Sequence, residues 1–209
     1  MTQLIHHVDA AIVVADKPAG LLAVPGRGPE RADCLAARVR ALHADALTVH
    51  RLDMATSGLI VFARGAAVQR AMSMAFASRA VDKRYVALVD GLVEADAGEI
   101  DLPLIADWLQ RPRQKVDHAI GKPSLTRWQV LSRDLSQRRT RLALEPFTGR
   151  SHQLRVHLAA IGHAIIGDDL YAAKDVATAS SRLLLHAARL AFAHPISGAA
   201  MAFESAPDF

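Results

Sequence analysis

The chain has 209 residues, of which 51% are apolar and 22% charged, a balance typical of a folded protein and not of a disordered one. No apolar run reaches the ~18 residues that a membrane span needs, and residues 1–10 lack the basic and apolar regions of a secretory signal. The single cysteine, Cys34, excludes an intrachain disulfide framework and a zinc ribbon. A formal charge of +4 permits nucleic-acid binding without indicating it. We expect a cytoplasmic protein with no membrane contact.

Short apolar runs separated by turn residues predict strands, and runs with helical spacing predict helices between them. Strands are expected at residues 11–15, 59–63, 83–89, 125–131, 140–145, 190–193 and 201–203, the fourth and fifth forming a hairpin. Helices are expected after Asp33, over residues 66–79, and after Ser151. Segments 102–115 and 174–181 show no period and are expected to be loops.

Each predicted helix has an apolar face, and two have a candidate cap. Asp33 is the expected N-cap of the first helix, whose apolar residues are Leu35, Val39 and Leu42, and Cys34 is expected to be a small apolar residue of that helix. Ser151 is the expected N-cap of the third helix, whose apolar residues are Leu154, Leu158 and Ile161. Gly162 ends this helix.

The most informative stretch is His50 to Leu59, a loop that leads into an apolar strand and carries Asp53. Gly58 permits backbone angles that other residues resist, and Thr56 and Ser57 can bond the local backbone. A lone Asp beside a loop is often only a turn residue, so the residues by themselves leave that interpretation open.

This stretch, His-Arg-Leu-Asp-x-x-Thr-Ser-Gly-Leu, resembles the catalytic motif of the RluA-type pseudouridine synthases. The resemblance implies that Asp53 is a nucleophile that isomerises uridine in RNA to pseudouridine. The Lys-Pro-x-Gly step that begins at Lys17 is also similar to the start of that catalytic domain. Only about ten residues precede the first predicted strand. We therefore expect a single catalytic domain over residues 1–209, without the small N-terminal RNA-binding domain of many relatives.

Two further motifs support the resemblance. Lys-x-Tyr-x-Ala resembles the segment whose Tyr, here Tyr85, stacks on the target base; the alternative is a half-buried strand aromatic. Gly-Arg-x-His-Gln-x-Arg-x-His resembles the segment whose second Arg, here Arg155, pairs with the catalytic Asp. The histidines of this motif are five residues apart, not the four that place two ligands on one helix face, so no metal site is expected.

Several basic residues are candidates for RNA contact. Resemblance implies that Arg51 fills the space left by a flipped base, and a guanidinium plane can stack on bases. His50 and Arg150, within the same motifs, are also expected to contact RNA. The loop with Arg111, Arg113 and Lys115 is a candidate phosphate contact, although a solvated surface loop would have the same composition.

The predicted reaction breaks the C1′–N1 bond of uridine and joins C5 to C1′, so it needs no cofactor and no energy source. The sequence accordingly has neither a phosphate-binding Gly-x-x-x-x-Gly-Lys nor a Gly-x-Gly-x-x-Gly motif. An Asp side chain with an ordinary pKa of about 3.9 is ionised at pH 7, and a nearby Arg opposes the rise in pKa that burial causes. A hydrolase using Ser57 lacks the Gly-x-Ser-x-Gly elbow. A non-catalytic RNA-binding protein would be expected to lack Asp53, Tyr85 or Arg155.

The expected fold is α+β: a mixed, mainly antiparallel sheet with flanking helices. Resemblance adds the pseudouridine synthase form, two lobes around a central cleft. Further segments resemble the dual-specificity branch of the family: Asp101–Ile105, Asp107-Trp108, Arg111-Pro112, Gln114–Val116 and the closing Ala206–Phe209. The expected substrates are therefore a hairpin of 23S ribosomal RNA and the anticodon stem-loop of certain tRNAs, modified by a monomer. The alternative is an enzyme with a single ribosomal target.

Overall fold

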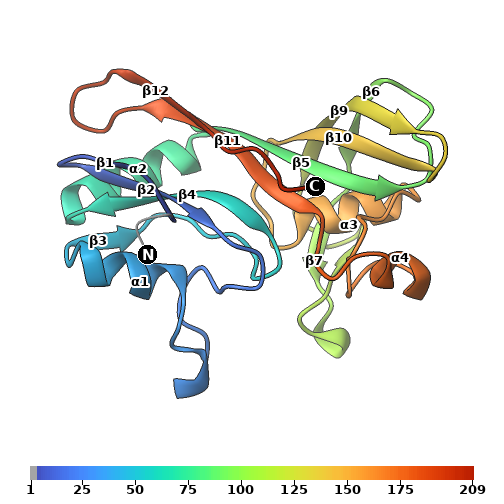
Figure 1. Ribbon diagram of the computed structural model, residues 1–209, viewed down its shortest axis with the longest axis horizontal. Coiled ribbons are helices and arrows are strands. Elements are labelled where there is room, and N and C mark those ends of the chain that lie inside the picture. The colour runs from blue at the N-terminus through green and yellow to red at the C-terminus, as the bar shows by residue number, and fades with distance from the viewer. Residues whose placement is uncertain (1–3) are drawn as a thin grey trace. The chain divides into compact units, whose positions relative to one another are not determined.

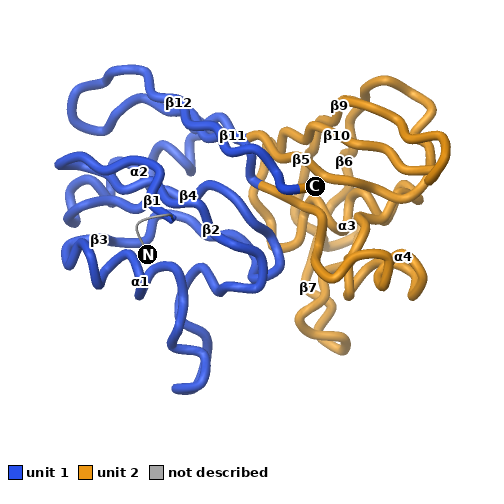
Figure 2. Tube along the Cα trace, in the orientation of Figure 1, with its two compact units in different colours: residues 1–83, 187–208 blue, residues 84–186, 209 orange. Residues whose placement is uncertain are grey.

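The computed structural model describes residues 4–209, which form two compact units (Figure 2). Unit 1 comprises the described residues up to Lys83 together with Ala187–Asp208, and unit 2 comprises Arg84–His186 and Phe209. The chain passes from one unit to the other within two strands, β5 (Asp82–Asp90) and β11 (Leu185–Ala193).

Unit 1 is built on antiparallel strand pairs (Figure 1). Neighbouring strands follow the order β1, β2, β4 and β11, with β3 beside β4 and β12 beside β11. The bounds are β1 (Ile5–Val8), β2 (Ile12–Lys17), β3 (Ala46–Thr48), β4 (Ser57–Arg64) and β12 (Ala200–Glu204). Nearly every residue of β2 and β4 is buried, so both faces of these strands are covered, which explains the apolar runs Ile12–Ala15 and Leu59–Ala63 within them.

Two helices complete unit 1: α1 (Leu35–Leu42) and α2 (Ala66–Ala77). Met72 of α2 packs into an apolar cluster with residues of β2, β4 and β11, and Val68, Ala75 and Phe76 join the edge of that cluster. The spacing of these residues is the helical period that the sequence shows. A short 3-10 turn, η2 (Pro29–Arg31), precedes α1.

Unit 2 contains an antiparallel sheet in the order β5, β10, β9, β6. Its further bounds are β10 (Arg139–Pro146), β9 (Leu125–Asp134) and β6 (Ala97–Asp101). A separate hairpin joins β7 (Leu104–Ala106) to β8 (Gln114–Val116), with the 3-10 turn η3 (Trp108–Gln110) at its tip. The helices are α3 (Gln153–Ala160) and α4 (Lys174–Thr178).

The predicted fold class, a mixed and mainly antiparallel sheet with flanking helices, is confirmed, as is the β9–β10 hairpin. The loop predicted at residues 102–115 is wrong, because the segment contains β7 and β8, which pair with each other. Each strand has three residues, too few to show a period in the sequence. The loop predicted at residues 174–181 contains α4, a helix of only five residues, which is too short to show a helical period. Strand β1, at the sheet edge, was not expected because its four residues, Ile-His-His-Val, do not alternate between apolar and polar side chains.

Both predicted helix caps are wrong by one residue. Cys34, not Asp33, caps α1: its Sγ accepts the Ala37 N–H at 3.3 Å, while the Asp33 carboxylate bonds the Arg38 guanidinium at 2.7 and 2.8 Å. Leu42, expected on the buried face, is 47% exposed. The third helix begins after His152, not Ser151, and Ile161 beyond its end is 38% exposed.

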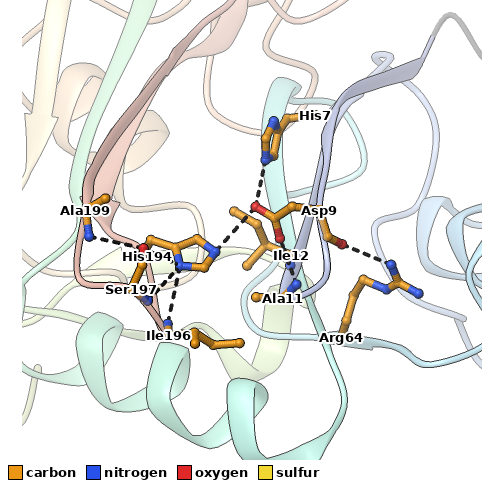
Figure 3. A network of polar contacts seen from close by, with 9 residues as sticks. All are labelled: His7, Asp9, Ala11, Ile12, Arg64, His194, Ile196, Ser197 and Ala199. Atoms are coloured by element: carbon orange, nitrogen blue, oxygen red, sulfur yellow. Dashed lines mark hydrogen bonds and ion pairs between the residues drawn. The ribbon is translucent and has the colours of Figure 1, made fainter.

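A polar network in unit 1 ties the β1–β2 turn to the β11–β12 hairpin (Figure 3). The Asp9 carboxylate lies 2.8 Å from His7 Nε2 and 3.4 Å from His194 Nε2, and accepts the backbone N–H groups of Ala11 and Ile12. Desolvation raises the pKa of Asp9, but the bonds to His7 and the two amides outweigh it and lower that pKa to about 2.

Within residues 4–209, no helix is long and apolar enough to cross a membrane.

Candidate active site

The loop that carries Asp53 is held by its backbone. The Thr56 N–H donates to the Asp53 carbonyl at 3.1 Å, which closes a turn directly after the aspartate. The carbonyl of Met54 accepts the Gly20 N–H at 2.9 Å. Thr56 and Ser57 are buried, whereas Asp53 is half-buried and Arg51 is exposed. The loop thus presents Asp53 and Arg51 on an immobilised turn.

Lys17 provides a second anchor for this loop, and the sequence analysis did not single it out as a site residue. Its side chain is fully buried at the end of β2, and Nζ donates to the carbonyl oxygens of Pro18, Leu21 and Met54 at 2.9, 2.7 and 2.9 Å. Three carbonyl acceptors compensate a buried ammonium that would otherwise be costly. The signal in the sequence was the Lys-Pro-x-Gly step at a turn.

The ninth position of the motif, Gly58, requires glycine because the backbone of Ala187 lies close to it. Its φ is +109°, and a Cβ at this position would lie 2.4 Å from the Ala187 carbonyl oxygen and 2.5 Å from the Ala187 nitrogen. Any larger residue would push β4 away from β11 directly after the turn that holds Asp53.

His50 is a structural part of the loop. Its Nε2 accepts the Val61 N–H at 3.1 Å, and its ring stacks on Phe76 with centroids 4.4 Å apart. Burial, with a smaller contribution from the charge of Lys83, lowers the pKa of His50 to about 3. Burial also lowers the pKa of Lys83. A neutral ring that accepts a backbone amide brings no positive charge to RNA, so the predicted RNA contact of His50 is not a cationic one.

Tyr85 lies on β5 opposite Leu144 of β10, and its side chain is half-buried. The neighbouring Arg84 forms an ion pair with Glu145 at 3.0 Å on the same two strands. A rigid antiparallel pair therefore carries the aromatic ring predicted to stack on the base.

Arg155, on α3, is held by acidic residues of unit 2. Its Nε and Nη2 donate to Asp168 Oδ2 and Oδ1 at 2.8 and 2.6 Å, and Nη2 also donates to Asp169 at 3.0 Å. The side chains of Arg155 and Asp168 are 4% and 0% exposed. The predicted pairing of Arg155 with Asp53 stays a prediction, and the structure adds a buried partner, Asp168, that the sequence did not indicate.

The rest of the α3 motif attaches this helix to the sheet of unit 2. The buried Gln153 side chain accepts from Thr148 and from the Arg150 N–H, and donates to Leu125 and Thr126. His157 lies 3.0 Å from both the Thr126 hydroxyl and the Leu102 carbonyl, and burial lowers its pKa. Gln153 and His157 thus attach α3 to the sheet, and the residues from Gln153 to Leu158 are all buried.

His152, before α3, and Tyr171 form a second contact of the motif. His152 has a φ of 55°, a left-handed conformation that is uncommon outside glycine, and its Nδ1 lies 2.6 Å from the Tyr171 hydroxyl. The same hydroxyl accepts the Gln114 N–H at 2.8 Å, which connects α3 to β8. Neither residue is among the predicted site residues, although His152 lies within the Gly-Arg-x-His-Gln-x-Arg-x-His motif.

The predicted basic loop is the β7–β8 hairpin of unit 2. Arg111 lies over the Trp108 ring at 3.7 Å, Arg113 bonds Gln110, and Lys115 lies 3.9 Å from Asp117. Trp108 and the adjacent Leu109 are 66% and 97% exposed. Arg150 is exposed at the turn before α3. The hairpin therefore offers cations and apolar surface together.

The predicted site residues divide between the units. His50, Arg51 and Asp53 belong to unit 1, while Tyr85, Arg111, Arg113, Lys115, Arg150 and Arg155 belong to unit 2. Among the described residues, no group of three or more His, Cys, Asp or Glu side chains is arranged to hold a metal ion.

Comparison with known proteins agrees with these motifs. The RNA pseudouridylate synthase family matches residues 11–160. The dual-specificity RNA pseudouridine synthase RluA of Yersinia pestis is 48% identical over 99% of this chain and 100% of that protein, and its counterpart in Pasteurella multocida is 47% identical over 98% and 93%. The solved structure of human RNA pseudouridylate synthase domain containing 1 superposes with a TM-score of 0.83 at 26% identity, over 98% of this chain and 83% of that one. The chain belongs to the RluA family of RNA pseudouridine synthases.

Proposed function

We propose that this enzyme converts uridine to pseudouridine in two RNAs, a hairpin of 23S ribosomal RNA and the anticodon stem-loop of certain tRNAs. The observation that carries the proposal is its similarity, at nearly half of all positions and over the full chain, to relatives named as dual-specificity pseudouridine synthases. A recognition site built for one short loop can serve any RNA that presents that loop, because sequence-specific RNA binding reads splayed, single-stranded bases.

Asp53 is the proposed nucleophile. A turn closed by Thr56 and a loop clamped by Lys17 hold its backbone, so the carboxylate is presented at a defined place. Such fixed positioning converts attack on a bound uridine into an effectively unimolecular step. Three alternative chemical routes would begin at this carboxylate: attack at C6 of the uracil, attack at C1′ of the ribose, and elimination to a glycal.

Tyr85 and Arg155 are the proposed partners of Asp53 in the complex with RNA. The Tyr85 ring would stack on the uracil, and its hydroxyl would assist proton removal from C5. Arg155 would pair with Asp53, which favours the ionised carboxylate and fixes its direction. Both side chains stand on rigid elements, β5 and α3.

The target uridine has to leave its stack before it can react, which costs a few kcal/mol, less in a loop than in a duplex. Arg51 is exposed two residues from Asp53, where its guanidinium plane could fill the space that the base leaves. Arg111, Arg113, Lys115 and Arg150 are the proposed phosphate contacts, which position the RNA without reading its sequence. The enzyme is proposed to act as a monomer.

The test uses isolated stem-loops of the two RNAs, each about one hairpin long, at matched salt because phosphate contacts make affinity salt-dependent. Pseudouridine is mapped in each hairpin after incubation with the full chain. We expect modification of both. Modification of the ribosomal hairpin alone would favour the alternative, an enzyme with a single ribosomal target.

A further inference from the structure

The carboxylate of Asp168 makes the most specific contact of Arg155. Two parallel bonds, Nε to Oδ2 at 2.8 Å and Nη2 to Oδ1 at 2.6 Å, match the fork of a guanidinium to the fork of a carboxylate. Both side chains are almost completely removed from solvent, at 4% and 0% exposed. This geometry fixes the plane of the guanidinium as well as its distance.

The same carboxylate also fixes Tyr171. Asp168 Oδ1 accepts the backbone N–H groups of Leu170 and Tyr171, each at 3.0 Å. The Tyr171 ring centroid then lies 5.2 Å from Arg155 Cζ, and the Tyr171 hydroxyl bonds the Gln114 N–H of the β7–β8 hairpin. One side chain thus orders the arginine and a contact of the basic hairpin.

The backbone leaves Asp168 little freedom. Its N–H donates to the Ile165 carbonyl at 3.2 Å, and the preceding Gly167 has a φ of +78°. A Cβ on Gly167 would lie 1.9 Å from the Arg182 carbonyl oxygen, so this turn requires glycine. The turn therefore fixes the position of the Asp168 carboxylate beside Arg155.

We propose that Asp168 is a positioning residue for the isomerisation, acting through Arg155; this inference rests on the proposed role of Arg155. A neutral Asn could accept the two turn amides, so the turn itself does not need a buried charge. A buried ion pair is weak evidence of stabilisation, because desolvation offsets the attraction. The negative charge of Asp168 is therefore explained by its effect on the position of Arg155.

Asp168 occupies the guanidinium edge formed by Nε and Nη2. The two parallel bonds fix the plane and the direction of the guanidinium. Asp168 also balances the charge of Arg155, so the arginine can orient the nucleophile without binding it as a tight isolated ion pair. Loss of Asp168 removes both effects at once.

The test is a double-variant cycle under single-turnover conditions with saturating RNA. Asp168→Asn should slow the isomerisation by about 10- to 100-fold, the range typical of residues that orient a functional ligand, and leave the dissociation constant for RNA unchanged. Asp175→Asn is the matched control: the same chemical change on an exposed side chain of α4. It should retain the wild-type rate.

The second arm adds Asp168→Asn to Arg155→Lys. If Asp168 acts through Arg155, the double variant is no slower than Arg155→Lys alone, because the two residues work as a unit. Multiplicative losses would show a merely structural role and overturn the inference, as would a wild-type rate of Asp168→Asn. If Arg155→Lys itself keeps the wild-type rate, the proposed role of Arg155 fails, which is a different result.

Asp168→Asn leaves a buried guanidinium without its counter-charge and could prevent folding. Asp168→Glu then replaces it, since it keeps the charge and displaces the carboxylate by one methylene. A folded Asp168→Glu protein with RNA affinity intact and turnover reduced by about tenfold or more supports the inference. Wild-type turnover of that variant overturns it.

Discussion

Lys17 illustrates how one side chain joins segments that are distant in the sequence. Its ammonium is fully buried and donates to three backbone carbonyls, one of which belongs to Met54, next to Asp53. A lysine places three donors at the end of a flexible stem, so it can satisfy several carbonyls that no backbone amide reaches. The loop that carries Asp53 thereby depends on the end of β2.

Lys17→Met is expected to destabilise the fold and to slow isomerisation. It keeps the length of the side chain but leaves the carbonyls of Pro18, Leu21 and Met54 without this donor, at a cost of about 1–3 kcal/mol for each that stays unsatisfied. Urea unfolding measures the first effect, and single-turnover assays of the folded fraction measure the second. RNA affinity should persist, since it rests on phosphate contacts.

The control for this variant is Lys174→Met, at the exposed start of α4. It should leave stability within about 0.5 kcal/mol of wild type, as is usual for surface positions. If RNA affinity of Lys17→Met fell as far as its turnover, Lys17 would act on RNA binding and not on the Asp53 loop.

At the scale of elements, α3 separates what the sequence predicts from what it cannot. The period of Leu154 and Leu158 predicts a helix, and Gly162 predicts its end, but nothing in that period indicates that Gln153 and His157 are buried as well. Their polar atoms bond β9 and the Leu102 carbonyl, which are distant in the sequence. Tertiary contacts of this kind bury polar residues that the sequence pattern alone would place at the surface.

The same distinction applies to the site. Asp53, Tyr85 and Arg155 were identified because they stand in motifs that resemble a known family. The partners of Arg155, Asp168 and Tyr171, are contributed by a turn beyond the helix, and their contacts depend on a Gly167 conformation that the sequence alone does not fix. The β7 and β8 strands were missed because three residues are too few for a period.

The basic residues of the β7–β8 hairpin are expected to contribute to RNA affinity and not to the rate of isomerisation. Replacing Arg111, Arg113 and Lys115 together with alanine should raise the dissociation constant for RNA and leave the single-turnover rate at saturating RNA unchanged. Each lost phosphate contact should reduce the slope of log affinity against log salt by about 1. Titrations of a stem-loop at several salt concentrations measure both quantities.

Its control is Arg138→Ala combined with Arg139→Ala, in the β9–β10 hairpin, because neither residue is a proposed phosphate contact. That variant should keep the wild-type salt slope. If the salt slope were unchanged in the β7–β8 variant and reduced in the β9–β10 variant, the phosphate contacts would belong to the β9–β10 hairpin. That result would contradict the prediction.

At the scale of the whole molecule, the predicted catalytic residues are distributed over both compact units, and the chain crosses between the units within β5, within β11 and again before Phe209. Asp53 belongs to unit 1 and Tyr85 and Arg155 to unit 2. Neither unit alone carries the full set, so folding of the complete chain is a condition for activity. Groups that change charge with pH then affect stability and activity together.

Stability should fall as the pH decreases below about 6.5, because of His50. Its pKa is about 3 in the folded chain and near 6.5 when unfolded, so the unfolded state binds the proton first. The contribution is fully present above pH 6.5 and is lost progressively toward pH 3, by at most about 1.4 kcal/mol per pH unit. Urea unfolding at pH 7, 6 and 5 measures it.

In His50→Gln this part of the pH dependence should disappear. His6→Gln, an exposed histidine on β1, should keep it. Below about pH 4 the carboxylate of Asp9, whose pKa is lowered to about 2, adds a separate loss as it protonates. A pH dependence between 7 and 5 that is identical in wild type and His50→Gln would contradict the buried, neutral state of His50.

The central claim is that Asp53 is the nucleophile of an RNA pseudouridine synthase, and Asp53→Asn tests it most directly. The variant keeps the size of the side chain and removes the negative charge. Pseudouridine formation in a uridine-containing stem-loop is measured for both proteins at saturating RNA, with RNA affinity measured in parallel. The account predicts pseudouridine with the wild type, none with the variant, and similar affinity for both, since binding rests on phosphate contacts. Turnover by Asp53→Asn above about a hundredth of the wild-type rate, far more than loss of a nucleophile leaves, would contradict it.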